Sequence, residues 1–146
     1  MALDVDVKRL AALPLLAELD LDALRLIAFS AETRILRAGD LLFTKGDASD
    51  GGFVVVSGAV ALDPSDSGQA AAKIIGPDSL IGELALVTET TRPATAIARQ
   101  PTVVLFISRK LFHRVLNEFP GGAARLRAAI ESRLAAFADG SKRFGK

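Results

Sequence analysis

Hydrophobic residues in the first thirty positions recur at the spacing of a helix. After Asp20, a residue type that caps helix N-termini, one apolar stripe forms along the chain. The stripe contains Leu21, Leu24, Ile27 and Ala28. A similar pattern precedes Pro14, so the sequence predicts helices over residues 1–30.

From Arg34 the pattern changes to short apolar runs that are separated by turn-forming dipeptides. The runs are RILRAGD, LLFTKGD, GGFVVVSGAVALD, KIIGPD, PATAIAR and VVLFIS. Turn signals at such close spacing are typical of an antiparallel sandwich or barrel. Ser57-Gly58 lies between two apolar stretches and predicts a hairpin with a two-residue turn. We therefore expect an antiparallel β-roll, or jelly-roll barrel, over residues 34–107.

Helical spacing returns after Ser108, which is a second predicted helix cap. The first apolar stripe is Leu111, Phe112, Val115, Leu116 and Phe119, and the second is Leu126, Ile130, Leu134 and Phe137. Pro120-Gly121-Gly122 separates them, and a basic tail follows over residues 139–146. The pattern predicts two C-terminal helices over residues 109–138. The expected fold is mainly β with flanking helices, in a single domain of residues 1–146.

The composition narrows the possible functions. Half of the 146 residues are apolar, which is enough for one sizeable core. The 18 basic and 17 acidic residues leave a net charge of +1, so bulk charge favours neither nucleic acid nor an anionic membrane as a partner. There is no cysteine and one histidine, His113, which excludes thiolate chemistry and clusters of imidazole metal ligands.

The N-terminal residues do not resemble a signal peptide, and no run of apolar residues is long enough for a membrane span. We therefore expect a cytoplasmic protein without a membrane partner. His113 is expected on a helix surface. Asp40, Asp47, Asp50, Asp63 and Asp66 are interpreted as turn formers, because too few acids gather in any one loop to bind calcium.

Residues 81–96, IGELALVTETTRPATA, contain the candidate chemistry. Gly82 lacks a Cβ, so a ligand can approach its backbone, and ELAL can begin a helical turn. The first amides of such a turn, near Leu84 and Ala85, have no partner inside the helix and favour an anion. Glu83 can accept hydrogen bonds from a sugar hydroxyl.

Arg92 is expected to enter a strand, because the proline behind it favours an extended conformation. Alternation along that strand places Ala94, Ala96 and Ala98 on the same face as Arg92. Small side chains beside a long cation leave room for an anion, and a phosphate suits the forked donors of a guanidinium. A simpler interpretation is a salt bridge between Glu83 and Arg92.

The segment also resembles a known family. GELAL, an arginine nine positions after the glutamate, and AT one residue further on resemble the phosphate-binding cassette of the cyclic nucleotide-binding domain family. That family includes regulatory subunits of cAMP-dependent protein kinase, cyclic nucleotide-gated channels and bacterial catabolite activator proteins. AGDLLFTKGDASDGGFVVVSGAV resembles the early strands of the family, and the resemblance covers nearly the whole chain.

The resemblance implies roles for residues of the cassette, here residues 81–95. Glu83 would hold the ribose 2′-hydroxyl, Arg92 would pair with the cyclic phosphate, and the amides near Leu84 and Ala85 would complete the anion site. Pro93 stands where the family usually has Ala, Ser or Thr, and it offers neither an amide proton nor a hydroxyl. Weaker affinity is therefore expected. The threonine associated with guanine preference is absent, which favours cAMP over cGMP.

Further candidate ligand contacts are Gly82, Ala94, Leu62, Ile74 and Phe137. Phe137 or Phe144 would serve as a lid over the base if the last helix moved on binding. The apolar stripe of that helix is expected to pack on the β-roll or to form a homodimer contact. The expected function is thus a non-catalytic sensor with cAMP or cGMP as its ligand, no cofactor, and another protein as its effector.

Three other functions compete with the sensor. A truncated or divergent DNA-binding regulator of the catabolite activator type is one alternative, because such a regulator needs a helix-turn-helix and too few residues of this sequence follow Gly122 to encode one. A small β-roll enzyme needs an acid-base pair or a metal cluster, and the sequence suggests neither. A degenerate domain used only for protein interaction is suggested by Pro93.

Overall fold

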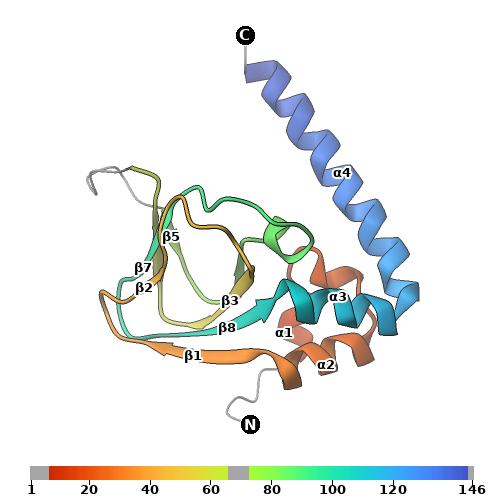
Figure 1. The fold of residues 1–146 in the computed structure, drawn as a ribbon, viewed down its shortest axis with the longest axis horizontal. Helices are drawn as coiled ribbons and strands as arrows, with labels where there is room; N and C mark the ends of the chain where they lie inside the picture. The colour runs from red at the N-terminus through yellow and green to blue at the C-terminus, as the bar shows by residue number, and fades with distance from the viewer. Residues whose placement is uncertain (1–6, 66–72, 145–146) are drawn as a thin grey trace.

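Two four-stranded antiparallel sheets face each other in the computed structural model, and helices gather at one end of them (Figure 1). The structure describes the backbone of residues 7–65 and 73–144, and side chains as far as residue 132. Before the first sheet lie α1 (Val7–Ala11), the 3-10 helix η1 (Leu16–Glu18) and α2 (Leu21–Ser30). The strands are β1 (Glu32–Leu36), β2 (Leu41–Phe43), β3 (Gly51–Ser57), β4 (Val60–Asp63), β5 (Lys73–Ile75), β6 (Ser79–Ile81), β7 (Thr95–Ala98) and β8 (Thr102–Ser108). A second 3-10 helix, η2 (Leu84–Leu86), separates β6 from β7, and α3 (Arg109–Glu118) and α4 (Pro120–Phe144) follow β8.

The strand order is β1-β8-β3-β6 in one sheet and β2-β7-β4-β5 in the other, so the predicted antiparallel β-roll with flanking helices is confirmed. The predicted hairpin at Ser57-Gly58 is wrong, because β3 and β4 belong to different sheets. Gly58 has a φ of 92° and carries the chain from one sheet to the other. The short strand β6, which pairs with β3, was not predicted.

Two clusters of buried side chains form the core. The outer cluster lies between the helices and the first sheet and includes Leu24, Phe112 and Leu105. The inner cluster lies between the two sheets and includes Phe53 and Val104. Alternate residues of β3 and β8 therefore enter different clusters, which explains why both strands are almost continuously apolar.

The N-terminal helices are confirmed from Val7 onward, and residues 1–6 lie outside the described residues. The predicted cap at Asp20 is wrong. Asp20 precedes α2 in an extended conformation, and its side chain makes no capping bond. Its carboxylate instead accepts a hydrogen bond from Nη2 of Arg125 in α4. Arg125 Nε also donates to the carbonyl of Glu18 at 3.0 Å. These contacts fasten the start of α4 to the N-terminal segment.

The C-terminal helices are confirmed, and their boundaries differ from the expected ones. Oγ of Ser108 accepts a hydrogen bond from the Leu111 amide at 3.0 Å and so caps α3 as predicted. α3 ends before Phe119, and Pro120 is already the first residue of α4 because proline suits that position. α4 continues to Phe144, so the backbone of residues 139–144 is helical instead of a tail. The side chains of Leu134, Phe137 and Phe144 lie outside the described residues.

In Figure 1, α4 leads away from the β-roll after its first turns. In the described part of the chain, no helix combines the length and the apolar character that a membrane crossing requires.

Candidate functional site

A cavity of about 360 Å³ lies between the segment after β6 and the segment before β7. Its walls are Gly82, Glu83, Leu84, Ala85, Thr90, Thr91, Arg92 and Pro93. The structure thus brings most of the predicted cassette residues to one cavity. Ala94 is buried immediately after this wall, with 8% of its surface exposed. Thr90 and Thr91 also belong to the wall and were not predicted.

The segment after β6 turns sharply into η2. Gly82 has a φ of 82°, in the left-handed region that favours glycine, and the short helical turn predicted for ELAL is confirmed. The prediction of a free amide at Ala85 is wrong, because this N–H donates to the carbonyl of Gly82 at 3.0 Å. A 3-10 helix closes its turns after three residues, so a short turn already uses this amide.

Arg92 lies just before β7, which begins at Thr95, so the predicted strand starts too early. The predicted alternation is nevertheless confirmed. Arg92, Ala94, Ala96 and Ala98 are buried, whereas the side chains between them are partly or fully exposed. Within β7 this follows from the period of two of a strand, whereas Pro93 and Ala94 form a bend before it.

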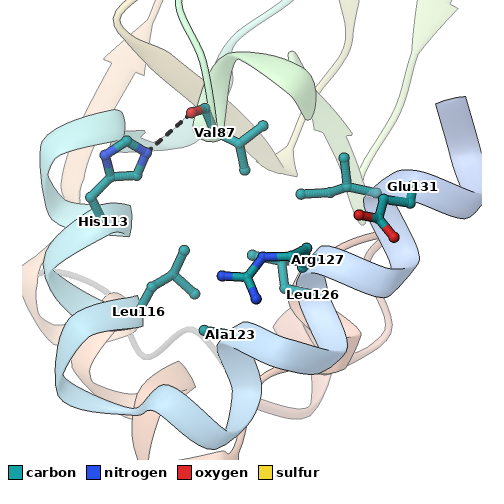
Figure 2. Close-up of a pocket in the computed structure, with 8 residues that line it drawn as sticks. Val87, His113, Leu116, Ala123, Leu126, Arg127 and Glu131 are labelled. Carbon is teal, nitrogen blue, oxygen red and sulfur yellow. Dashed lines mark hydrogen bonds between the residues drawn. The ribbon is translucent and has the colours of Figure 1, made fainter.

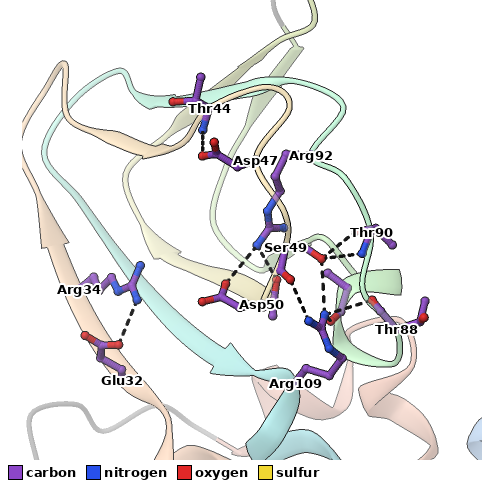
Figure 3. Close-up of polar contacts among 12 residues, drawn as sticks. Glu32, Arg34, Thr44, Asp47, Ser49, Asp50, Thr88, Thr90, Arg92 and Arg109 are labelled. Atoms are coloured by element: carbon purple, nitrogen blue, oxygen red, sulfur yellow. Dashed lines mark hydrogen bonds and ion pairs between the residues drawn. The ribbon is translucent and has the colours of Figure 1, made fainter.

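The guanidinium of Arg92 is held in the interior, with 4% of the residue exposed. Nη2 donates to the carbonyl of Gly51 at 2.8 Å and lies 3.8 Å from Oδ1 of Asp50 (Figure 3). Cζ lies 4.3 Å from the centre of the Phe43 ring. Burial lowers the pKa of Arg92, the charge of Arg109 lowers it further, and the carboxylates of Asp50 and Asp47 act in the opposite direction.

A second cavity, of about 480 Å³, also has Arg92 in its wall. Its walls include Arg34, Phe43, Asp47 and Asp50. The carboxylate of Asp47 accepts a hydrogen bond from the Thr44 amide at 2.9 Å and forms a turn, as predicted. Asp50 differs from that prediction, because its carboxylate faces Arg92.

Two other predicted turn formers are confirmed, and one lies outside the described residues. Asp40 accepts a hydrogen bond from the Arg37 amide at 2.8 Å, and Asp63 accepts one from the Ser65 amide at 2.9 Å. Asp66 belongs to the segment that the structure does not describe. In the described ranges 7–65 and 73–132, no group of three or more acidic or histidine side chains is arranged for a metal ion.

Ser49 and Arg109 support the candidate site and were not predicted. Ser49 is buried, and its Oγ accepts hydrogen bonds from both the amide and the hydroxyl of Thr90 at 2.9 Å. Arg109 donates to the carbonyl of Ala85 in the cassette and to the carbonyl of Ser49 in the loop before β3 (Figure 3). The residue pairs are between 24 and 60 positions apart in the chain. No local pattern in the sequence indicates such contacts.

The remaining predicted site residues lie elsewhere or are not described. Glu83 is half-buried in the wall of the first cavity. Leu62 packs against the inner cluster, Ile74 is 51% exposed on β5, and neither is among the residues that line this cavity. The side chain of Phe137 falls outside the described residues.

His113 lies on the exposed surface of α3, as predicted, with Nε2 3.1 Å from the carbonyl oxygen of Val87. It borders a third cavity, of about 390 Å³, between Val87 of the cassette, α3 and α4 (Figure 2). Leu116 and Leu126 line its inner side, and Arg127 and Glu131 stand on α4 beside it.

Comparison with known proteins gives a consistent result. The sequence model of the family described as "Cyclic nucleotide-binding domain" matches residues 33–119. Lysophospholipase nte1 of Neurospora crassa is 32% identical over 121 residues, which are 82% of this chain and 8% of that protein. The cAMP-dependent protein kinase regulatory subunit of Yarrowia lipolytica is 33% identical over 102 residues, which are 70% of this chain and 26% of that protein.

Among solved structures, the N-terminal domain of a transcriptional regulator from Streptomyces coelicolor A3(2) has a TM-score of 0.81 and 33% identity. The match covers 90% of this chain and 94% of that domain. The chain therefore corresponds to a nearly complete solved domain, whereas it spans only 8% and 26% of the two curated relatives.

Proposed function

This chain belongs to the cyclic nucleotide-binding domain family, and on that premise we propose that it binds a cyclic nucleotide monophosphate as a regulatory module that catalyses no reaction. The observation that supports this proposal best is the buried guanidinium of Arg92 in the wall of the cavity formed by residues 82–85 and 90–93. At about 360 Å³, the cavity lies within the range of about 300–1,000 Å³ that is usual for small-molecule sites.

The phosphate is assigned to Arg92. Within the described residues, both polar contacts of its guanidinium use Nη2, which leaves Nε and Nη1 available to an anion. The amide of Leu84 is the second proposed donor. The amide of Ala85 would join only after it leaves the carbonyl of Gly82, because it already donates there. Glu83, on the same wall, is proposed to accept hydrogen bonds from the ribose hydroxyl.

We favour cAMP as the ligand. The position after Arg92 holds Pro93 and not the threonine that is associated with guanine preference in the family. One relative that is 33% identical is named as a cAMP-dependent protein kinase regulatory subunit, which supports the same choice. A protein effector, a homodimer formed through α4, and the cytoplasm as compartment remain predictions.

Movement of the C-terminal helices is proposed as the response to binding. Val87 belongs to the cassette, and its carbonyl lies 3.1 Å from Nε2 of His113 on α3. The third cavity lies between these residues and α4 (Figure 2), so there is space into which a helix can shift. A change in the backbone of residues 82–87 would therefore reach α3 first and α4 through it.

Isothermal titration of the chain with cAMP and cGMP tests the proposal. Saturation at 100 times Kd is expected to add about 2.7 kcal/mol to the free energy of unfolding, which raises the melting temperature by several degrees. Arg92→Leu should lose most of that rise, whereas Arg99→Leu, at an exposed position after β7, should keep it. Absence of heat with both nucleotides at about millimolar concentration would exclude the proposal and favour the degenerate interaction domain.

A further inference from the structure

Arg109, the first residue of α3, reaches with its side chain into the loops around the candidate site (Figure 3). Nη1 donates to the carbonyls of Ala85 at 2.8 Å and of Thr88 at 3.1 Å. Nη2 donates to the carbonyl of Ser49 at 2.8 Å. One half-buried guanidinium therefore holds three carbonyls that come from two separate loops.

Both loops belong to the candidate site. Ala85 lines the proposed ligand cavity, and Thr88 lies two residues after the end of η2. Ser49 lies in the loop between β2 and β3, and its hydroxyl accepts hydrogen bonds from Thr90, which also lines the cavity. Arg109 thus binds the cavity wall directly through Ala85 and indirectly through Ser49.

The backbone of Arg109 is fixed at the same point. Its amide donates to the carbonyl of Asp50 at 2.8 Å, and the preceding residue, Ser108, caps α3. A shift of the loop at residues 85–88 must therefore either move the start of α3 or break the hydrogen bonds of this guanidinium. The geometry of the guanidinium suits this task, because its rigid fork binds several acceptors at once, whereas an ammonium group is a point charge.

α3 in turn contacts α4 inside the outer core cluster. Phe112 and Val115 of α3 are fully buried in that cluster, and Leu126 of α4 is buried in it as well. A contiguous path of packed groups therefore leads from Ala85 through Arg109 and α3 to α4.

We propose that Arg109 is a positioning residue that transmits occupancy of the candidate site to α3 and α4. This inference rests on the proposed binding of a cyclic nucleotide. Arg109 has no assigned contact with the ligand. It acts through the carbonyls of Ala85, Thr88 and Ser49. Its removal should therefore reduce the movement of α3 and α4 more than it reduces the affinity for the ligand.

The test uses a fluorescent reporter on α4. The chain has no cysteine, so Ser132→Cys, at an exposed position of α4, can be labelled at a single site. Titration with cAMP then gives two independent quantities, the Kd and the amplitude of the fluorescence change at saturation. The variants are Arg109→Gln and Arg109→Lys. The matched control is Arg114→Gln, since Arg114 lies on the same helix and pairs with Glu118 at 3.4 Å on the exposed surface.

For Arg109→Gln we expect loss of the amplitude at saturating cAMP. The Kd should rise by less than about tenfold, because the bonds that are lost go to backbone carbonyls and not to the ligand. Arg109→Lys should give an intermediate amplitude, and Arg114→Gln should match the unchanged chain. A merely structural role would raise Kd and lower the melting temperature but leave the amplitude at saturation intact.

Full amplitude in Arg109→Gln at saturation would overturn the inference. If circular dichroism shows that Arg109→Gln does not fold, Arg109→Lys decides: a reduced amplitude supports the coupling role and an unchanged amplitude overturns it. A failure of the proposed function itself is distinguishable, because the unchanged chain would then show no binding of cAMP by titration calorimetry.

Discussion

Gly82 and Arg92 lie so close together that a Cβ atom on Gly82 would stand 2.8 Å from Nη1 of Arg92. Gly82 also has a φ of 82°, which side chains disfavour. Two independent constraints therefore favour glycine here. One is the left-handed backbone conformation, and the other is the space that the buried guanidinium occupies. The glycine of the cassette shapes the position of the arginine as well as the turn.

Gly82→Ala should consequently destabilise the fold and displace Arg92. We expect the free energy of unfolding to fall by about 1–2 kcal/mol from the left-handed backbone alone, and the Kd for cAMP to rise because the guanidinium moves. Urea denaturation and titration calorimetry measure the two effects. Gly76→Ala is the control, since its added Cβ meets no atom within 4 Å and its φ is not in the left-handed region. Equal urea midpoints for the two variants would show that neither constraint operates.

Ser49→Ala tests the contact between the two loops of the site. Ser49 is 3% exposed, and its Oγ accepts hydrogen bonds from the Thr90 amide and hydroxyl. Removing a buried acceptor leaves its donors unsatisfied, so the free energy of unfolding should fall by about 1–3 kcal/mol. Guanidinium chloride denaturation provides the measurement. Ser132→Ala on the exposed surface of α4 should change it by less than about 0.5 kcal/mol, and a similar small effect for Ser49→Ala would contradict the prediction.

Leu126→Ala tests how firmly α4 is attached. Leu126 is 2% exposed within the outer cluster, whereas the equally large Leu21 on α2 is 50% exposed. Because alanine retains helix propensity, the main effect is a cavity, and we expect a loss of about 2–5 kcal/mol in the free energy of unfolding. Leu21→Ala should lose much less. Thermal and urea denaturation of both variants check the difference, and equal losses would mean that α4 is not anchored by this residue.

Local rules predicted the elements well and their long-range partners poorly. The burial of Ala96 and Ala98 on alternate positions of β7 could be read from the sequence because the period of a strand is local. The assignment of β3 and β4 to one hairpin failed, because glycine at a turn indicates a change of direction and not which strands pair. Pairing of β3 with β8 and of β4 with β7 decides the sheets.

The candidate site shows the same division. Residues 82–85 and Arg92 were predicted because they share one short segment of sequence. The support from Ser49 and Arg109 could not be predicted, since those residues are 60 positions apart and each is an ordinary polar residue in its local context. Asp20 gives a third example. Its sequence position favours a helix cap, but an ion pair with Arg125, far along the chain, takes the carboxylate away.

Pro93 gives the last prediction. It is exposed in the wall of the proposed ligand cavity and offers no amide proton, unlike the Ala, Ser or Thr that is usual in the family. Pro93→Ala restores a donor beside Arg92, and a hydrogen bond to a charged group contributes about 1.5–3 kcal/mol, so the Kd for cAMP should fall by roughly tenfold or more. Pro93→Ser should bind at least as tightly, because it adds a hydroxyl.

Stability without ligand should change in the opposite direction, which makes the two effects separable. Replacing proline by alanine raises the entropy of the unfolded chain, so the free energy of unfolding of the ligand-free protein should fall by about 0.4–1 kcal/mol. Pro101→Ala, in the exposed loop after β7, should show this loss without tighter binding. Titration calorimetry and thermal denaturation of the three variants measure both quantities. An unchanged Kd in Pro93→Ala would mean that the phosphate does not approach residue 93.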